Sequence, residues 1–143
     1  MIAAFDREYA FLSNYYPSIF IYEGIEYPTN EHFFQAMKTL NIDERKEIAA
    51  CETPGRAKRM GRRVQLRPDW EDVKIDIMRK GLEMKFSIPE LKTKLLATGD
   101  EELVEGTTWH DQIWGLCTCE KCKGQGKNLL GQLLMEIRNK MEK

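Results

Sequence analysis

Apolar residues recur every three or four positions along most of the chain, a spacing typical of amphipathic helices. The longest such stretches cover residues 70–86 and the end of the chain from about Lys127, and shorter ones cover residues 30–40 and 89–98. A further short helix, rich in basic residues, is expected after Thr53-Pro54. The pattern therefore predicts five helices joined by short connections.

Five residues punctuate these stretches as helix ends require. Thr29, Thr53 and Asp69 each precede a helical stretch and suit the N-cap position. Pro54 suits the first helical position, where its missing N–H is not needed. Gly99 can take the left-handed conformation that closes a helix.

The clearest β signal lies near the start of the chain. The β-prone runs Ile19–Tyr22 and Ile25–Tyr27 flank Glu23-Gly24, which suits a two-residue hairpin turn. With 143 residues the chain can bury one sizeable core but is short for two domains of ordinary size. We therefore expect an α+β fold that is predominantly α-helical, a compact single domain over residues 1–143 with a small N-terminal β-hairpin.

Composition adds constraints on partners and location. The chain is 42% apolar and 31% charged with a formal net charge of −1, so a nucleic-acid partner would have to be held by a local basic patch. The start of the chain lacks the apolar run of a signal peptide, and no stretch approaches the roughly 18 apolar residues of a membrane span. We expect a cytoplasmic protein with no membrane partner.

A polar stripe runs along residues 30–40. Glu31, Gln35 and Lys38 follow the spacing i, i+4, i+7 and so share one face, apart from the apolar positions. They are candidates for a functional site. The ordinary alternative is an exposed polar face with a modest contact between Glu31 and Gln35.

The segment Phe11–Pro17 mixes aromatic side chains with small hydrogen-bonding ones in a region that reads as a loop. Ser13 and Asn14 could hold a polar ligand while Tyr15 or Tyr16 stacks on a ring. An ordinary turn ended by Pro17 is the alternative.

Two segments could bind an anion. Arg59 and Arg62 belong to a run of basic residues in an otherwise neutral chain, and guanidinium groups match phosphate oxygens. Lys127 and Asn128 lie in the glycine-rich stretch 124–131 at the start of the last helix, where backbone N–H groups can hold an anion. A solvated basic surface and a simple glycine-rich turn are the alternatives.

The segment 109–115 joins two tryptophans, a carboxylate and a glycine. Tryptophan usually packs in a core, which is the ordinary interpretation of Trp114. Asp111 has no obvious helix to cap and no partner four residues away. It is the better site candidate of the two.

Three of the four cysteines, Cys117, Cys119 and Cys122, lie within six residues. A structural zinc needs four ligands, and the candidates for the fourth are Cys51 and His110, neither at a standard knuckle spacing. A catalytic cysteine is disfavoured because neither histidine lies in the context of a known thiol-nucleophile motif. The metal question stays open between a reduced cluster and a structural zinc.

In order along nearly the whole chain, these segments resemble the NADAR family. The matching stretches are Phe11–Asn14, Tyr27–Lys38, Ala57–Arg62, Arg67–Trp70, Lys85-Phe86, Leu95–Gly99, Trp114-Gly115 and Gly126–Gly131. Their number and order are far more specific than any single one. The chain departs from the simpler family pattern in carrying the cysteine loop beside the predicted site.

The resemblance implies a largely helical enzyme that hydrolyses N-glycosides of ribose and requires no cofactor. Carried over by position, Glu31 is the acid of the Glu-His pair, Lys38 the lysine, Trp70 the aromatic residue and Asp111 the acid before the Trp-Gly pair. Glu31 could stabilise positive charge on the sugar, and Lys38 could form a Schiff base with it. Trp70 would stack on a base, and Asp111 would hold ribose hydroxyls or position Lys38.

The same resemblance implies two substrate classes. The first is ADP-ribose attached to guanine, with ADP-ribosylated nucleic acid as the partner. The second is a phosphoribosylamino-pyrimidine intermediate of riboflavin synthesis. A non-catalytic module that binds ADP-ribose, and a zinc-stapled interaction domain, are the alternatives from other classes.

Overall fold

A computed structural model describes residues 1–142 of the chain, and over these residues it contains six α-helices, one 3-10 helix and two small two-stranded sheets. The predicted α+β class, mainly helical with an N-terminal hairpin, is confirmed. The chain forms two compact units: a central unit, Asn14–Ile88, and a terminal unit made of Met1–Ser13 and the chain from Pro89 onward. The single-domain organisation stays a prediction. No helix in the described part of the chain is both long and apolar enough to cross a membrane.

The hairpin of the central unit forms as predicted. Strands β1 (Phe20–Tyr22) and β2 (Ile25–Tyr27) pair antiparallel, with Phe20 opposite Tyr27. The turn residues Glu23 and Gly24 both have positive φ, 49° and 81°. That is the backbone that a type I′ turn requires, and it matches the right-handed twist of the strands.

Helix α1 (Asn30–Ala36) begins as predicted and ends earlier. The Thr29 side chain accepts a hydrogen bond from the His32 N–H, which confirms it as the N-cap. The helix does not reach Leu40, which is 58% exposed. Beyond the C-cap Met37, two carbonyls turn to other segments: that of Lys38 accepts from the Arg67 N–H at 2.7 Å, and that of Thr39 accepts from the Arg45 side chain.

Helix α2 (Ile42–Ala49) was not predicted, because its sequence carries one apolar side chain, Ile48, that is buried. The connection between Leu40 and Thr53 was expected to be merely polar. The signal for a helix was its N-cap: the Asn41 side chain accepts a hydrogen bond from the Glu44 N–H.

Helices α3 (Pro54–Gly61) and α4 (Trp70–Lys85) lie where they were predicted. Thr53 caps α3 through the Arg56 N–H, with Pro54 at the first helical position. Asp69 occupies the N-cap position of α4 as predicted, but its side chain makes no capping hydrogen bond. Its carboxylate pairs with the Arg67 guanidinium at 2.7 and 3.2 Å instead.

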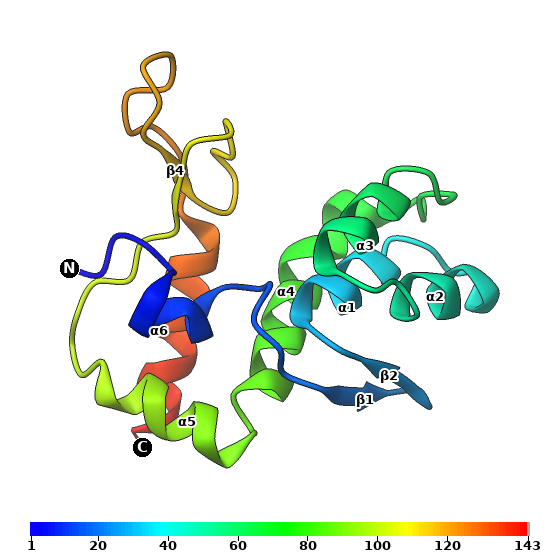
Figure 1. Cartoon of the computed structure of the whole chain (residues 1–143), viewed down its shortest axis with the longest axis horizontal. Coiled ribbons are helices and arrows are strands. Elements are labelled where there is room, and N and C mark those ends of the chain that lie inside the picture. Colours follow the sequence, from blue (N-terminus) through cyan, green and yellow to red (C-terminus); the bar gives the residue numbers. More distant parts are fainter. Residues whose placement is uncertain (143) are drawn as a thin grey trace. The chain divides into compact units, whose positions relative to one another are not determined.

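Helix α1 is the centre of the central unit, and all seven of its residues are buried. It packs against α2, α3 and α4 (Figure 1). The Phe33 ring meets three hairpin rings nearly edge-on, those of Phe20, Tyr22 and Tyr27, with centroids 5.2–5.5 Å apart. The polar residues of α1 are therefore held in a rigid, largely dry setting.

The terminal unit combines the 3-10 helix η1 (Arg7–Leu12), α5 (Pro89–Ala97), α6 (Leu129–Met141) and a short parallel pair, β3 (Gly106–Thr107) with β4 (Leu116–Cys117). Of the five apolar positions predicted for one face of α6, Leu130, Leu133, Leu134 and Ile137 are buried and Met141 is partly exposed. Gly99 follows α5 with φ +61°, which confirms the predicted helix closure.

Candidate active site

Glu31 lies in the first turn of α1 and is only 7% exposed. The Gln35 side chain donates a hydrogen bond of 2.7 Å to its carboxylate, and its own backbone N–H donates to the Asn14 carbonyl. The interpretation of this stripe as an exposed polar face is therefore wrong, because Glu31 and Gln35 are both buried. Because little water surrounds this carboxylate, its electrostatic interactions with nearby charges are stronger than they would be at the surface.

Lys38 lies in the turn that follows α1 and is half-buried. Burial lowers the pKa of Lys38 below its ordinary value; the charges of Arg62 and Lys58 add to this, and that of Glu31 opposes it. Glu31 and Lys38 are thus close enough to influence each other. A lysine with a lowered pKa has a larger neutral, nucleophilic fraction near neutral pH.

Tyr15 joins the same group of side chains. Burial raises the pKa of Tyr15, the Glu31 charge raises it further, and the Arg62 charge lowers it. Its ring is still 44% exposed, so a ligand could reach it. The expectation that Tyr15 stacks on a ring stays a prediction.

Asn14 fixes the segment before the hairpin to α1. Its side-chain oxygen accepts from the Asn30 amide at 2.9 Å, and both residues are buried. This accounts for Asn14 structurally, and its predicted contact with a ligand stays a prediction. Ser13 belongs to the terminal unit, where its backbone N–H closes η1 on the Ala10 carbonyl.

Trp70 opens α4 and is nearly buried, 7% exposed. Its ring packs on Phe34 with centroids 5.0 Å apart, and the Lys38 ammonium lies 5.9 Å from the ring centre. Little of the indole is left to stack on a base. The arrangement favours a second role, in which Trp70 holds the Lys38 side chain in place.

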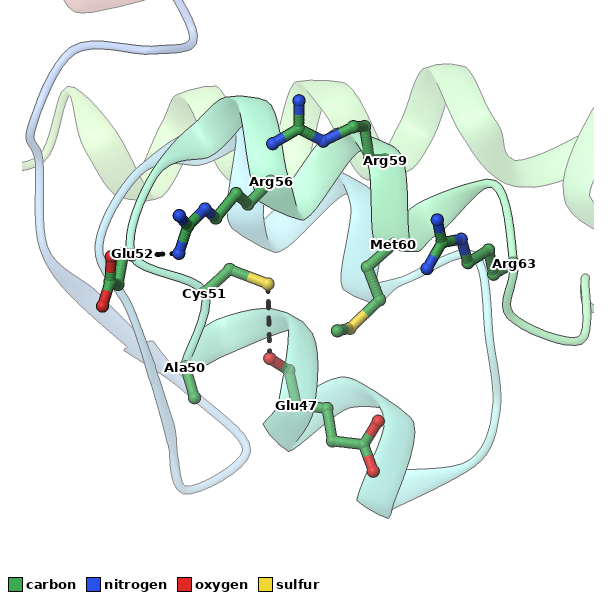
Figure 2. Close-up of a pocket in the computed structure, with 8 residues that line it drawn as sticks. All are labelled: Glu47, Ala50, Cys51, Glu52, Arg56, Arg59, Met60 and Arg63. Atoms are coloured by element: carbon green, nitrogen blue, oxygen red, sulfur yellow. Dashed lines mark hydrogen bonds and ion pairs between the residues drawn. The ribbon is translucent and has the colours of Figure 1, made fainter.

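The basic stretch divides between two faces of α3. The charges of Lys58 and Arg62, one turn apart, lower the pKa of Lys38. Arg56, Arg59 and Arg63 instead line a separate open pocket of about 420 Å³ between α2 and α3 (Figure 2). The two predicted anion-binding arginines, Arg59 and Arg62, are therefore not brought to one site.

The pocket between α2 and α3 has a mixed lining. Arg56 is paired with Glu52 at 3.0 Å, and the Cys51 thiol donates to the Glu47 carbonyl (Figure 2). Arg59 and Arg63 supply the rest of its positive charge. Neither Glu31 nor Lys38 lines this pocket.

Asp111, in the terminal unit, has a local partner that the sequence did not reveal. One carboxylate oxygen accepts from the backbone N–H groups of Ile113 and Trp114, at 3.1 and 2.9 Å. Asp111 thus holds a tight turn, a role that aspartate fills well. Its predicted catalytic role, and the predicted substrate contact of Trp114, stay predictions.

The start of α6 does not offer a free set of backbone donors. The N–H groups of Lys127, Asn128, Leu129 and Leu130 donate to the carbonyls of residues 112, 115, 113 and 114. The Asn128 side chain is also occupied, because it bridges the Glu105 N–H and the Leu103 carbonyl. Of the predicted anion site, the exposed Lys127 ammonium is what remains.

The cysteine cluster gains a fourth partner. The ligand atoms of His110, Cys117, Cys119 and Cys122 all lie within 4.8 Å of one another. His110, and not Cys51, completes the set that the sequence left open. Four such atoms could hold a metal ion, which is consistent with the zinc considered from the sequence.

Lys58 lowers the pKa of Lys38; it belongs to the basic run that the sequence offered as an anion site, four residues before Arg62. One further residue was missed. Asn30 is fully buried and holds Asn14. No pattern in the sequence separates Asn30 from an ordinary polar residue in a first helical turn.

The chain matches the NADAR domain model over residues 3–142. It is 42% identical over 137 residues to N-glycosidase YbiA of Shigella flexneri, covering 94% of this chain and 82% of that protein. It is 34% identical over 140 residues to a riboflavin biosynthesis protein of Vibrio vulnificus, covering 96% of this chain and 37% of that protein. The NMR structure of Escherichia coli YbiA superposes with a TM-score of 0.82 at 40% identity, covering 99% of this chain and 85% of that one.

The name of the Shigella relative supports an N-glycosidase function. The extent of the model match and the identity to YbiA show that this chain belongs to the NADAR family.

Proposed function

We propose that this protein hydrolyses the N-glycosidic bond between a ribose and a base, and that it removes ADP-ribose from guanine in nucleic acid. One observation carries the proposal: Glu31 and Lys38 lie in one partly dry site, where burial lowers the pKa of the lysine and the carboxylate acts on it. The N-glycosidase name of YbiA supports the reaction class.

The proposed role of Glu31 is to stabilise the positive charge that develops on the sugar. Breaking the bond between ribosyl C1 and the base nitrogen builds positive charge at C1, and a carboxylate beside it stabilises that charge. Gln35 holds the carboxylate at 2.7 Å, so Glu31 needs little rearrangement during the reaction. Water is activated by the same group when the sugar is released.

Lys38 supplies a covalent route. Its neutral amine attacks C1 of the opened ribose, the bond from C1 to the base nitrogen breaks, and the base leaves with a proton. The resulting imine between Lys38 and C1 is then hydrolysed by water, which returns the free amine and the sugar aldehyde. Arg62 and Lys58 favour this route because their charges lower the pKa of Lys38.

The division of the basic residues supports a large substrate. Lys58 and Arg62 lie toward Lys38 and can meet the phosphates next to the ribose, as the pyrophosphate of ADP-ribose requires. Arg59 and Arg63 lie on the other face of α3 and can meet the backbone of a polymer. A small substrate would need only the first group.

A riboflavin intermediate is the second candidate. The specific observation in its favour is the name of the Vibrio vulnificus relative, a riboflavin biosynthesis protein. A phosphoribosylamino-pyrimidine carries one phosphate, and Lys58 with Arg62 can hold it.

Two substrates offered to the wild-type protein separate these candidates. The first is a DNA oligonucleotide ADP-ribosylated on guanine, from which we expect free ADP-ribose. The second is a phosphoribosylamino-pyrimidine, from which the riboflavin candidate expects a free pyrimidine and ribose phosphate. Tight binding of ADP-ribose by calorimetry with turnover of neither substrate would overturn the enzymatic proposal in favour of a binding module.

Matched arginine variants test the polymer. We expect Arg59→Ala with Arg63→Ala to raise KM for the oligonucleotide and to leave cleavage of a mononucleotide-sized ADP-ribosyl guanosine unchanged. Arg62→Ala should impair both substrates. Equal effects of the Arg59 and Arg63 changes on both substrates would exclude a role for this face in holding a polymer.

A further inference from the structure

We propose that His110, Cys117, Cys119 and Cys122 form a structural zinc site that holds the loop of residues 108–127 in the terminal unit. One imidazole nitrogen and three thiol sulfurs form a donor set that structural zinc sites use. All four ligand atoms lie within 4.8 Å of one another.

The distances suit tetrahedral coordination. Zinc bonds of about 2.3 Å to sulfur and 2.0–2.1 Å to nitrogen place a nitrogen and a sulfur ligand about 3.5 Å apart. The His110 Nδ1 atom lies 3.3 Å from the Cys122 sulfur and 3.4 Å from the Cys119 sulfur. Little movement of these side chains is needed for both sulfurs to share an ion with the ring nitrogen.

Backbone hydrogen bonds hold the chain around the cysteines in a tight turn. The Lys123 N–H donates to the Cys119 carbonyl, and the Gly124 N–H donates to the Cys117 carbonyl. Lys123 and Gly124 both have positive φ, 52° and 81°, which turns the chain sharply after Cys122. The turn brings the last cysteine back toward the first.

His110 also has an unusual backbone, which points to a positioned side chain. Its φ is +68°, a left-handed conformation that a non-glycine residue adopts at a cost and keeps where its surroundings require it. Its own backbone N–H points at the Cys117 sulfur, 3.2 Å away. Donation from a backbone N–H to a ligand sulfur is the kind of contact that supports metal-bound thiolates.

The loop has little apolar packing of its own. Between residues 108 and 127 the buried apolar side chains are those of Cys117 and Cys122, while Trp109 and Ile113 are exposed. Its regular structure is the two-residue strand β4 and a bridge between Cys117 and Gln125, and backbone hydrogen bonds make its other contacts. A cross-link stabilises a segment that lacks a core, and the four cysteines of the described chain are all free of disulfides.

The site would also set the position of two candidate residues. Asp111 follows His110 directly, and the turn that it makes with Trp114 leads into the carbonyls that receive the N–H groups of α6. Loss of the ion is expected to loosen this turn. Zinc binding itself does not depend on the proposed function.

Zinc content and thiol protection of the full chain test the site. We expect about one zinc per purified chain, and Co²⁺ in its place should give the visible bands of a tetrahedral thiolate site. With zinc bound, an alkylating reagent should modify Cys51 first and leave the three cluster thiols protected. After chelation all four should react.

Matched cysteine variants complete the test. Cys119→Ser and His110→Ala remove partly exposed ligands and should weaken zinc binding at least about tenfold, whereas Cys51→Ser should retain it. Circular dichroism of each variant shows whether the helices survive. Equal zinc content in Cys119→Ser and Cys51→Ser, a disulfide within the cluster, bound iron in place of zinc, or no protection of the wild-type thiols would each overturn the proposal.

Discussion

The Lys38 ammonium lies 5.9 Å from the centre of the Trp70 ring, although Lys38 follows α1 and Trp70 opens α4, with α2 and α3 between them along the chain. Trp70 is itself fixed, since it packs on Phe34 inside the central unit. Contact with an aromatic face restricts a flexible lysine side chain. Trp70 therefore limits where the Lys38 amine can lie, while burial is what lowers the pKa of Lys38.

Replacement of Lys38 by alanine is expected to abolish cleavage and to leave the fold intact. Lys38 is half-buried at the end of a turn, so its loss removes few packing contacts. In the wild type, a reductant that traps imines should leave the ribosyl fragment attached to the protein, detectable by mass spectrometry. Neither Lys38→Ala nor Lys38→Arg should trap it.

Lys80→Ala is the matched control, because Lys80 also lies over an aromatic ring of the central unit, that of Tyr22, at 5.6 Å. The Lys80→Ala variant should still be trapped with the ribosyl fragment by the reductant, and it should turn over substrate like the wild type. Full activity of Lys38→Ala would exclude the covalent route. The remaining mechanism would be direct attack on the sugar by a water molecule that Glu31 activates.

Replacement of Glu31 by glutamine should lower kcat by about 10²–10⁴-fold, the usual size of a general acid–base contribution. Stability should change by less than about 1 kcal/mol, because the amide keeps the shape and can still accept from Gln35. Single-turnover kinetics and urea unfolding measure the two effects. The control is Glu26→Gln, which changes an exposed acid of β2. If Glu31→Gln loses stability but keeps its kcat, Glu31 is a structural residue.

The pH dependence of cleavage should report on Arg62. Lys38 attacks in its neutral form, so activity should rise with pH through a pKa below the ordinary value of 10.5. The Arg62 charge lowers this pKa, so Arg62→Ala should move the rise to higher pH. The Arg59 side chain lines the pocket between α2 and α3, so Arg59→Ala should leave the pH of this rise unchanged. A shift to lower pH in Arg62→Ala would contradict the electrostatic link.

Patterns that act locally made most of the fold predictable. The hairpin, the N-caps Thr29 and Thr53 and the αL residue Gly99 depend on neighbours within a few residues, and the structure confirms all of them. Helix α2 escaped prediction because its stability comes from packing of one apolar residue and a cap, not from a periodic stripe. The path of the chain after α1 also depends on distant partners, above all the Arg67 N–H that binds the Lys38 carbonyl.

The site was less predictable than the fold. Spacing placed Glu31 and Gln35 on one face but could not tell a solvated face from a buried one, since that depends on what α3 and α4 cover. The turn role of Asp111 and the role of His110 at the cysteines need contacts that helical periodicity does not encode. In the sequence, the two faces of α3 appear only as pairs of basic residues spaced four positions apart.

Replacement of Gly61 by alanine should destabilise the protein by about 1–3 kcal/mol, as overpacking commonly does. A Cβ at Gly61 would collide with the Oε1 atom of Gln35, which α1 holds against Glu31. Urea unfolding measures the loss. Gly55→Ala is the control in the same helix: its Cβ would have Thr53 Oγ1 at 3.9 Å as its nearest neighbour, so this change should be neutral or stabilise by about 0.4–1 kcal/mol.

The fully buried His32 should make the protein less stable in mild acid. Its ring lies between the Thr29 hydroxyl at 2.8 Å and the Cys51 carbonyl at 3.0 Å, and burial lowers the pKa of His32 below 6.5. The unfolded chain therefore takes up a proton near pH 6.5, while the folded chain resists until lower pH, so stability is complete above 6.5 and falls as pH decreases. Urea midpoints between pH 7.5 and 5.5 should fall more in the wild type than in His32→Gln; a wild type that gains stability relative to His32→Gln in acid would show that the ring is charged in the folded protein.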